Sequence, residues 1–202
     1  DFSEGAGLAV ERAARLAQAH GALLWLLHVF DDGVWASVRN LYDLDRWTGA
    51  DPVLAARECL AQQATDLSAR FGIFVKAETR NGRAPAAIAA FANECGAGLL
   101  AMGVRGEDWL RYAMLGGSAL RVAEHADVPV LLVRRPAVTD FAKVLVATDF
   151  SDGARRAARW ALDLCPALRL TLLNAYVVEF EGRMRLAGAT NEDIELYRTQ
   201  ER

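Results

Sequence analysis

Two kinds of hydrophobic pattern alternate along the chain. Residues 22–30 (ALLWLLHVF) and 97–103 (AGLLAMG) are almost continuously apolar, which is typical of strands buried on both faces of a parallel sheet. Two shorter apolar runs, 73–79 and 128–135, are also predicted to be strands. Apolar residues recur at helical spacing in four segments, 4–20, 52–71, 84–96 and 117–126. This regular alternation predicts an α/β fold with a doubly wound parallel sheet.

The helix ends carry recognisable signals. Ser3 is a plausible N-cap for the helix that begins at Glu4, and Pro52 suits the first turn of the next helix. The segment between them, 31–51, mixes Gly, Trp, Asp and Asn and is expected to be a long excursion. After a linker at 136–142, a second series is predicted: a strand at 143–148, a helix at 152–164, a strand at 168–178 and a helix at 190–202.

An internal repeat organises the chain. The opening residues DFSEGA (1–6) match DFSDGA (149–154), and LLHVF (26–30) matches LLNAY (172–176). In the second copy a strand leads into the motif, whereas the first copy starts at Asp1 without one. We therefore expect a tandem chain truncated at both ends. It would comprise a first domain at 1–135 that lacks its first strand, the linker at 136–142, and the N-terminal half of a second domain at 143–202.

Composition narrows the functional classes. The 202 residues carry a net charge of −3, so no basic field suggests a nucleic-acid partner. Cys59, Cys95 and Cys165 lie far apart and form no metal-binding pattern, which favours buried free thiols in a reducing cytosol. No apolar run is long enough to span a bilayer. These features predict a cytoplasmic protein without a membrane or metal site.

The most informative segment runs from Gly103 to Ser118 (GVRGEDWLRYAMLGGS). Four glycines in a loop between a strand and a helix indicate either a tight turn or a close approach to a ligand. A row of amides at a helix start attracts an anion. Arg105 could pair with phosphates, although Glu107 and Asp108 oppose this. The residues alone leave both readings open.

These motifs resemble those of the universal stress protein family. The resemblance rests on VLVATDFSDGA, on LLWLLHVF and on MGVRG…LGGSALRVAEHADVPVLLVRR, and it covers 1–135 and the front half of a second copy. The family's nucleotide signature is G-x2-G-x9-G-[S/T/N]. Gly103, Gly106 and Gly116 match this spacing, whereas Gly117 replaces the polar residue and Ser118 follows it. The resemblance implies a Rossmann-like fold of the adenine nucleotide α-hydrolase type, with a five-stranded parallel sheet in the order 3-2-1-4-5.

The resemblance also implies a ligand. The family's pattern would make the protein a stress-response sensor or regulator that holds ATP, with or without Mg²⁺, in the first domain. Asp1 would face adenine and the backbone of Val29 would meet the base. The implied binding residues are Asp1, Val29, Met102, Gly103, Arg105, Gly106, Gly116, Gly117 and Ser118. Asp1 could instead simply cap a helix, and Gly103 and Gly106 could serve only a turn. The alternative is a regulatory dimerisation module of the same fold that binds no nucleotide.

No catalytic constellation is visible. The chain has neither a G-x4-G-K-[S/T] phosphate loop nor a G-x-S-x-G elbow. Catalytic residues are therefore not assigned, and slow ATP hydrolysis is the most that we expect. The strand at Val130–Val133 resembles the edge strand through which family members pair, so a homodimer is expected there. His28 lies in an apolar run, where a core role is favoured over ligand binding.

Overall fold

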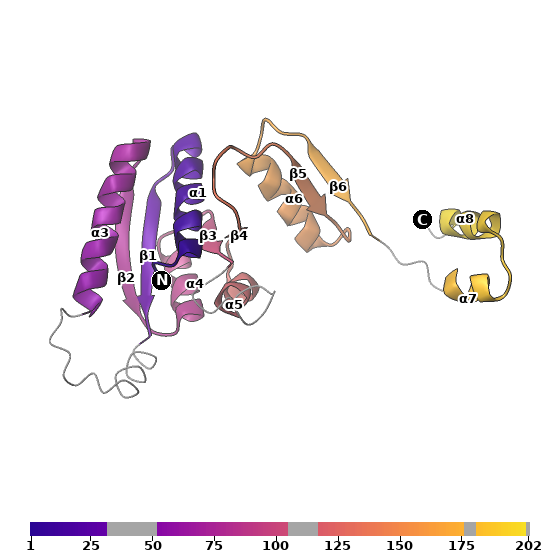
Figure 1. The fold of residues 1–202 in the computed structure, drawn as a ribbon, viewed down its shortest axis with the longest axis horizontal. Helices are drawn as coiled ribbons and strands as arrows, with labels where there is room; N and C mark the ends of the chain where they lie inside the picture. The colour runs from indigo at the N-terminus through magenta and orange to yellow at the C-terminus, as the bar shows by residue number, and fades with distance from the viewer. Residues whose placement is uncertain (32–51, 105–116, 176–180, 201–202) are drawn as a thin grey trace. The chain divides into compact units, whose positions relative to one another are not determined.

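The computed structural model describes residues 1–31, 52–104, 117–175 and 181–200, which divide into two compact units, 1–140 and 141–202 (Figure 1). The first unit alternates helix and strand as predicted. Its elements are α1 (Glu4–His20), β1 (Leu24–Phe30), α3 (Pro52–Phe71), β2 (Val75–Asn81), α4 (Ala84–Glu94), β3 (Leu100–Gly103), α5 (Gly117–His125) and β4 (Val130–Val133). The excursion expected at 31–51 lies almost wholly outside the described residues.

The second unit follows the predicted order with two differences. Its elements are β5 (Val144–Ala147), α6 (Asp152–Leu164), β6 (Leu170–Leu173), α7 (Glu181–Leu186) and α8 (Asn191–Gln200). Strand β6 begins at Leu170 and ends at Leu173, whereas the prediction was 168–178, of which 176–178 lie outside the described residues. Just beyond the strand, the Asn174 side chain donates a hydrogen bond to the Thr148 carbonyl at 2.7 Å. Helix α7 was not predicted, since six residues are too few to display a helical hydrophobic period.

The strands pair in parallel, as the buried runs predicted. Leu24–Phe30 of β1 pairs with Val75–Asn81 of β2, β3 pairs with β4, and β5 pairs with β6. Among the described strands, no ladder joins β1 to β3. The first unit thus contains two parallel pairs in place of one continuous sheet, and the five-stranded order stays a prediction.

Helix α1 has well-formed ends. The Ser3 hydroxyl oxygen accepts a hydrogen bond from the Ala6 amide at 3.2 Å, which confirms the predicted N-cap. Gly21 ends the helix in the left-handed conformation, at φ 61°, and its amide reaches back to the Ala17 and Gln18 carbonyls. Towards this end, the Gln18 side chain donates to the Phe71 carbonyl at 2.7 Å. The C-terminal ends of α1 and α3 are therefore linked.

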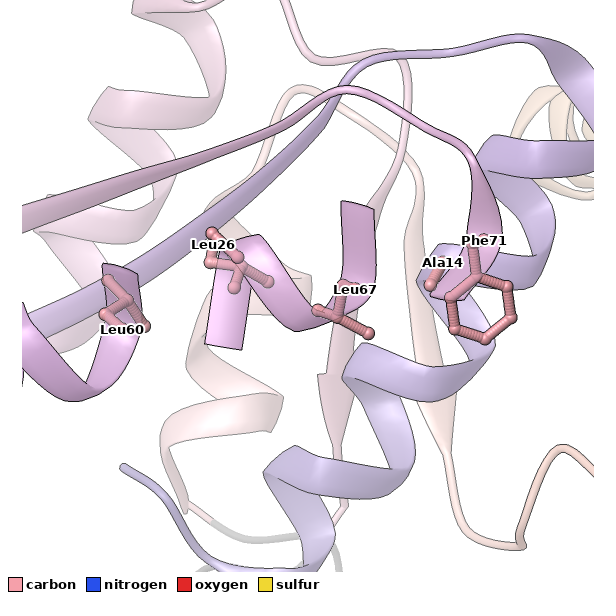
Figure 2. Packing of buried hydrophobic residues seen from close by; sticks show 6 residues of the cluster. Ala14, Leu26, Leu60, Leu67 and Phe71 are labelled. Atoms are coloured by element: carbon pink, nitrogen blue, oxygen red, sulfur yellow. The ribbon is translucent and has the colours of Figure 1, made fainter. Parts of the chain in front are cut away.

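The main core of the first unit lies where α1 and α3 cover one face of the β1–β2 pair. Figure 2 shows Ala14, Leu26, Leu60, Leu67 and Phe71 buried together in this layer. Burying each large apolar side chain contributes about 1.5–3 kcal/mol relative to exposure. Trp25, next to Leu26 on β1, points to the opposite face of the strand pair. There it makes an edge contact with Phe91 of α4, with ring centroids 5.4 Å apart. Both faces of this strand pair are thus covered by helices.

The three cysteines form no disulfide, but they are not all buried. Cys59 is exposed, so the expectation of buried thiols is wrong at this position. The reason is its place on α3: its neighbour Leu60 faces the core, and the next position along a helix turns away from it. Cys95 and Cys165 are partly buried.

No helix in the described part of the chain is both long enough and apolar enough to cross a lipid bilayer.

Candidate functional site

The N-terminal turn of α1 lies against the carboxyl ends of two strands. The ring of Phe2 stacks on that of His28, near the end of β1, with centroids 4.9 Å apart and planes inclined by 26°. Three residues on, the backbone of Gly5 packs directly against Gly103, the last residue of β3. Residues 1–5 therefore connect the ends of β1 and β3. In open α/β folds, ligands bind beyond the carboxyl ends of the strands.

Asp1 organises this turn. One of its carboxylate oxygens, Oδ1, accepts hydrogen bonds from the Ser3 amide at 3.1 Å and the Ser3 hydroxyl at 2.7 Å. Phe2, between them, has a φ of 53°, a left-handed conformation that bulky residues rarely adopt. The Asp1 side chain is exposed and thus accessible from solvent. The alternative that Asp1 serves the helix cap therefore has structural support, because it holds the capping residue Ser3.

Gly103 is placed by packing against α1. A Cβ at this position would overlap the carbonyl group of Gly5 and lie 3.0 Å from its Cα. Gly103 is therefore a glycine because two backbones approach closely here. The next residue, Val104, is buried, and its amide donates to the Val133 carbonyl at 3.3 Å. This amide is engaged by main chain.

Two further predicted residues lie at the same strand ends. Val29 is the penultimate residue of β1, and Met102 is the penultimate residue of β3; both are half-buried. The described members of the predicted site are Asp1, Val29, Met102, Gly103, Gly117 and Ser118. Gly117 and Ser118 begin α5, so the predicted helix start is confirmed. Arg105, Gly106 and Gly116 lie outside the described residues.

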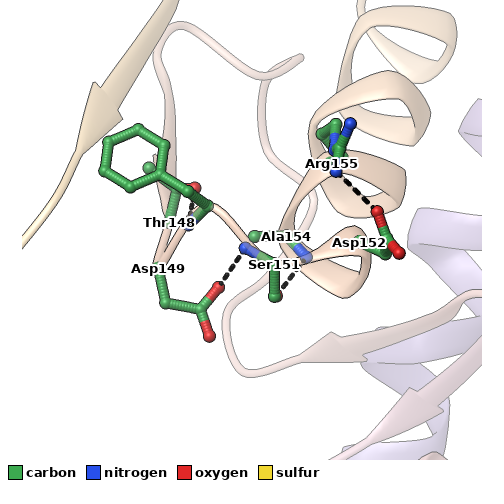
Figure 3. Close-up of polar contacts among 7 residues, drawn as sticks. Thr148, Asp149, Ser151, Asp152, Ala154 and Arg155 are labelled. Carbon is green, nitrogen blue, oxygen red and sulfur yellow. Dashed lines mark hydrogen bonds and ion pairs between the residues drawn. The ribbon is translucent and has the colours of Figure 1, made fainter.

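The second unit contains the same turn (Figure 3). The Asp149 carboxylate accepts from the Ser151 amide at 2.9 Å, and the Ser151 hydroxyl oxygen accepts from the Ala154 amide at 3.2 Å, which caps α6. Phe150 has a φ of 64°, close to that of Phe2. Hydrogen bonds from the side chain and amide of Ser151 lower the pKa of Asp149 below its ordinary value. The repeated sequence DFS therefore adopts one local structure in both places.

The two turns differ in what surrounds the phenylalanine. Phe2 stacks on His28, whereas the side chain of Phe150 is 72% exposed. Phe150 borders an open cavity of about 360 Å³ whose other lining residues are Thr148, Ala154, Arg155, Ala158 and Leu172. Arg155, its only charged lining residue among those described, forms an ion pair with Asp152 at 2.6 Å.

The ring contacts around His28 were missed by sequence reasoning, which favoured a core role for this residue. The ring is only partly buried, and it also meets Phe30 edge-on, with centroids 4.5 Å apart. The contact between His28 and Phe30 could have been predicted from their spacing, because residues two apart on a strand share a face. The contact between His28 and Phe2 could not be predicted from sequence spacing, because it depends on where α1 begins relative to β1 in space.

Metal binding has no support in the described residues, which contain no cluster of three or more His, Cys, Asp or Glu side chains suited to hold an ion.

The site therefore lies at the carboxyl end of parallel strands in an α/β protein, and comparisons specify the family. Residues 1–134 match the universal stress protein family, and the chain belongs to that family. No match was found among curated proteins.

Solved structures show the same fold. The universal stress protein UspA from Lactobacillus plantarum is 23% identical, with a TM-score of 0.54, over 66% of this chain and 92% of that one. A universal stress protein from Archaeoglobus fulgidus DSM 4304 is 21% identical, with a TM-score of 0.66, over 93% of this chain and 69% of that one. Another from Archaeoglobus fulgidus is 19% identical, with a TM-score of 0.51.

Proposed function

We propose that this protein is a stress-response regulator that binds an adenine nucleotide, ATP above all, at the strand ends joined by residues 1–5. The observation that carries the proposal is the position of the Asp1 turn. It meets β1 through Phe2 and His28, and it meets β3 through Gly5 and Gly103. The turn that contacts Gly103 through Gly5 thus also carries the exposed Asp1 carboxylate.

The described residues fit the base of the nucleotide. A carboxylate has acceptor positions on both oxygens, which suits the exocyclic amino group of adenine. In this proposal Asp1 accepts from that group, and the backbone of Val29 meets the ring edge. Met102 supplies apolar contact at the end of β3. Both residues are half-buried, so each retains surface that a ligand can cover.

The phosphates would lie towards the glycine signature and α5. Gly103, Arg105, Gly106, Gly116, Gly117 and Ser118 would approach them, and Mg²⁺ would accompany the phosphates. A helix N-terminus contributes about 0.3–1 kcal/mol to the free energy of binding an anion. Hydrogen bonds to charged groups contribute about 1.5–3 kcal/mol each. Several such contacts are needed for the roughly 8 kcal/mol of a micromolar complex.

The alternative is a regulatory module of the same fold that binds no nucleotide. Two observations favour it. The missing side chain of Gly103 accommodates the Gly5 backbone, and the Val104 amide already has the Val133 carbonyl as its acceptor. These two positions are therefore explained by packing alone. In this alternative the Asp1 turn only caps α1.

Further properties are part of the same proposal. We propose a homodimer through Val130–Val133, a tandem arrangement of two family domains and a cytoplasmic location. No catalytic residue is assigned, and any ATP hydrolysis would be slow. Each of these stays a prediction.

A calorimetric titration with ATP, ADP and AMP tests the function. We expect ATP to bind the 202-residue chain and Asp1→Ala to weaken binding about tenfold or more, because one hydrogen bond to a charged group contributes about 1.5–3 kcal/mol. Asp149→Ala is the matched control, because it removes the same type of turn in the second unit. The control should keep the wild-type affinity. Absence of binding heat with all three nucleotides would support the alternative.

A further inference from the structure

His28 is packed between two aromatic rings at the proposed site. Phe2 stacks on one side of the imidazole at 4.9 Å, and Phe30 meets it edge-on at 4.5 Å. Phe2 belongs to the turn that carries Asp1, and Phe30 ends β1. The imidazole is therefore a contact between the end of β1 and the N-terminal turn.

The environment of the imidazole favours its neutral form. Its Nδ1 atom is buried and has no hydrogen-bond partner among the described residues. A protonated imidazole carries an N–H on both nitrogens, and here one of them would have no acceptor. Burial is the main cause that lowers the pKa of His28 below its ordinary value of 6.5. Attraction between a cation and the neighbouring rings acts in the opposite sense.

The charged groups around His28 offer its Nδ1 no acceptor in the described structure. Asp1 precedes the stacked Phe2 in sequence, Glu4 lies in the first turn of α1, and Arg57 lies on α3. Arg57 donates to Thr79, the residue paired with His28 across the ladder, at 3.0 Å. Asp31 follows β1. Lys76, Glu78 and Arg80 occupy alternate positions of β2 and therefore point to the other face.

We propose that His28 is a pH-sensitive positioning residue: its neutral ring holds the Phe2 turn in place, and its protonation releases that turn and weakens nucleotide binding. The inference rests on the proposed function. The mechanical connection is short. Phe2 lies between Asp1 and Ser3, which are joined by two hydrogen bonds, and Ser3 caps α1. Displacing the ring of Phe2 therefore displaces the carboxylate assigned to adenine.

The first experiment measures ATP affinity by calorimetry from about pH 7.5 to about pH 5.5, where histidine changes its charge. We expect wild-type affinity to fall roughly fivefold or more, a typical coupling between two sites. His28→Phe keeps an aromatic ring without a titrating group and should lose this pH dependence. His125→Gln is the control. The Nδ1–H of His125, in the last turn of α5, donates to the Arg121 carbonyl at 2.7 Å, and the variant should keep the wild-type pH profile. An unchanged pH profile in His28→Phe would overturn the proposal.

A second experiment needs no nucleotide and separates this inference from the proposed function. Nuclear magnetic resonance of the whole chain can follow the His28 ring and the Ser3 amide through a pH titration. We expect the Ser3 amide to shift with the midpoint of His28, below 6.5, and to lose that shift in His28→Phe. If ATP does not bind but Ser3 follows His28, only the proposed function fails. If Ser3 ignores His28, the inference fails whatever ATP does.

Discussion

At the scale of single residues, the chain uses glycine and serine for different physical tasks. Gly103 lacks a side chain because the Gly5 backbone occupies the space that a Cβ would need. Ser3 and Ser151 each use one hydroxyl oxygen to satisfy an amide at the start of a helix. The first task depends on two distant segments meeting, whereas the second is local. This difference decides which residue can be interpreted from sequence.

Replacing Gly103 by alanine should destabilise the first unit. The added Cβ would overlap the Gly5 carbonyl, so α1 or β3 must shift, at a typical cost of about 1–3 kcal/mol. Gly7→Ala is the matched control, because nothing lies within 4 Å of the Cβ it would add. In a helix this control should stabilise by about 0.5–1 kcal/mol. Urea denaturation of both variants checks the prediction, and equal midpoints would contradict it.

Ser151→Ala should change the acid titration of Asp149. Hydrogen bonds from Ser151 lower the pKa of Asp149 from its ordinary value of 3.8, so the variant should bring it back towards that value. A lowered carboxyl pKa adds stability above the unfolded value, and this stability is lost as the pH falls through the folded value. The variant should therefore lose less stability in acid, on a baseline reduced by about 1 kcal/mol through loss of the cap.

Carbon-detected nuclear magnetic resonance of the carboxyl groups measures this change. Asp193 is an internal control, because its pKa is lowered by Thr190 and the substitution does not touch that pair. Equal pKa values of Asp149 in wild type and variant would show that the Ser151 hydroxyl is not the cause.

At the scale of elements, sequence predicted what local forces determine. Helical periods in the sequence placed α1, α3, α4 and α5, because a buried stripe on a helix repeats its apolar residues at helical spacing. Continuous apolar runs placed strands between them, because a strand buried on both faces is apolar at successive positions. The caps at Ser3 and Ser151 follow from one side chain each. The contact of Phe2 with His28 and that of Gly5 with Gly103 were not predictable, since they depend on how α1 lies over the strand ends.

For the candidate site, the signature spacing nominated Gly103 and the family resemblance nominated Asp1. Their role in binding stays a prediction. Sequence could not show that Asp1 binds Ser3 or that Gly103 serves helix packing, because both depend on atomic distances. Helix α7 was missed for a different reason: its six residues make no core stripe.

At the scale of elements, the testable prediction is that strand β4 forms a dimer interface. Among the described strands it pairs only with β3, so its other edge remains a template for a further strand. If this edge forms the dimer, Leu131→Lys should shift the wild-type dimer towards monomer in sedimentation equilibrium, because a charge disfavours an apolar edge interface. Leu145→Lys is the control, because Leu145 on β5 is already 60% exposed. A wild-type monomer at micromolar concentration would contradict the dimer.

At the scale of the whole molecule, the hydrophobic core is unevenly shared. Among the described residues, the buried apolar side chains lie mostly in unit 1, and only Val146 and Ile194 belong to residues 141–202. Helix α6 has no buried residue at all. Folding costs each unit chain entropy, which burial of apolar surface must offset. The second unit has much less buried apolar surface for this purpose.

The second unit should therefore open more readily than the first. Hydrogen exchange monitored by mass spectrometry should show faster exchange in β5, α6 and β6 than in β1, β2 and α3, because local opening depends on how much burial is lost. Peptides from the two strand pairs form the matched comparison, since both pairs are parallel ladders. Equal protection in both units would contradict this expectation.

The left-handed phenylalanine has a consequence for how the two DFS turns can diverge. Glycine or asparagine would fill such a position with less strain, so an aromatic residue there is disfavoured unless its ring is used. The ring of Phe2 makes such a contact, since it stacks on His28, whereas the ring of Phe150 is largely exposed to solvent. Natural variation should therefore be tolerated first at Phe150, while Phe2 and His28 would have to change together.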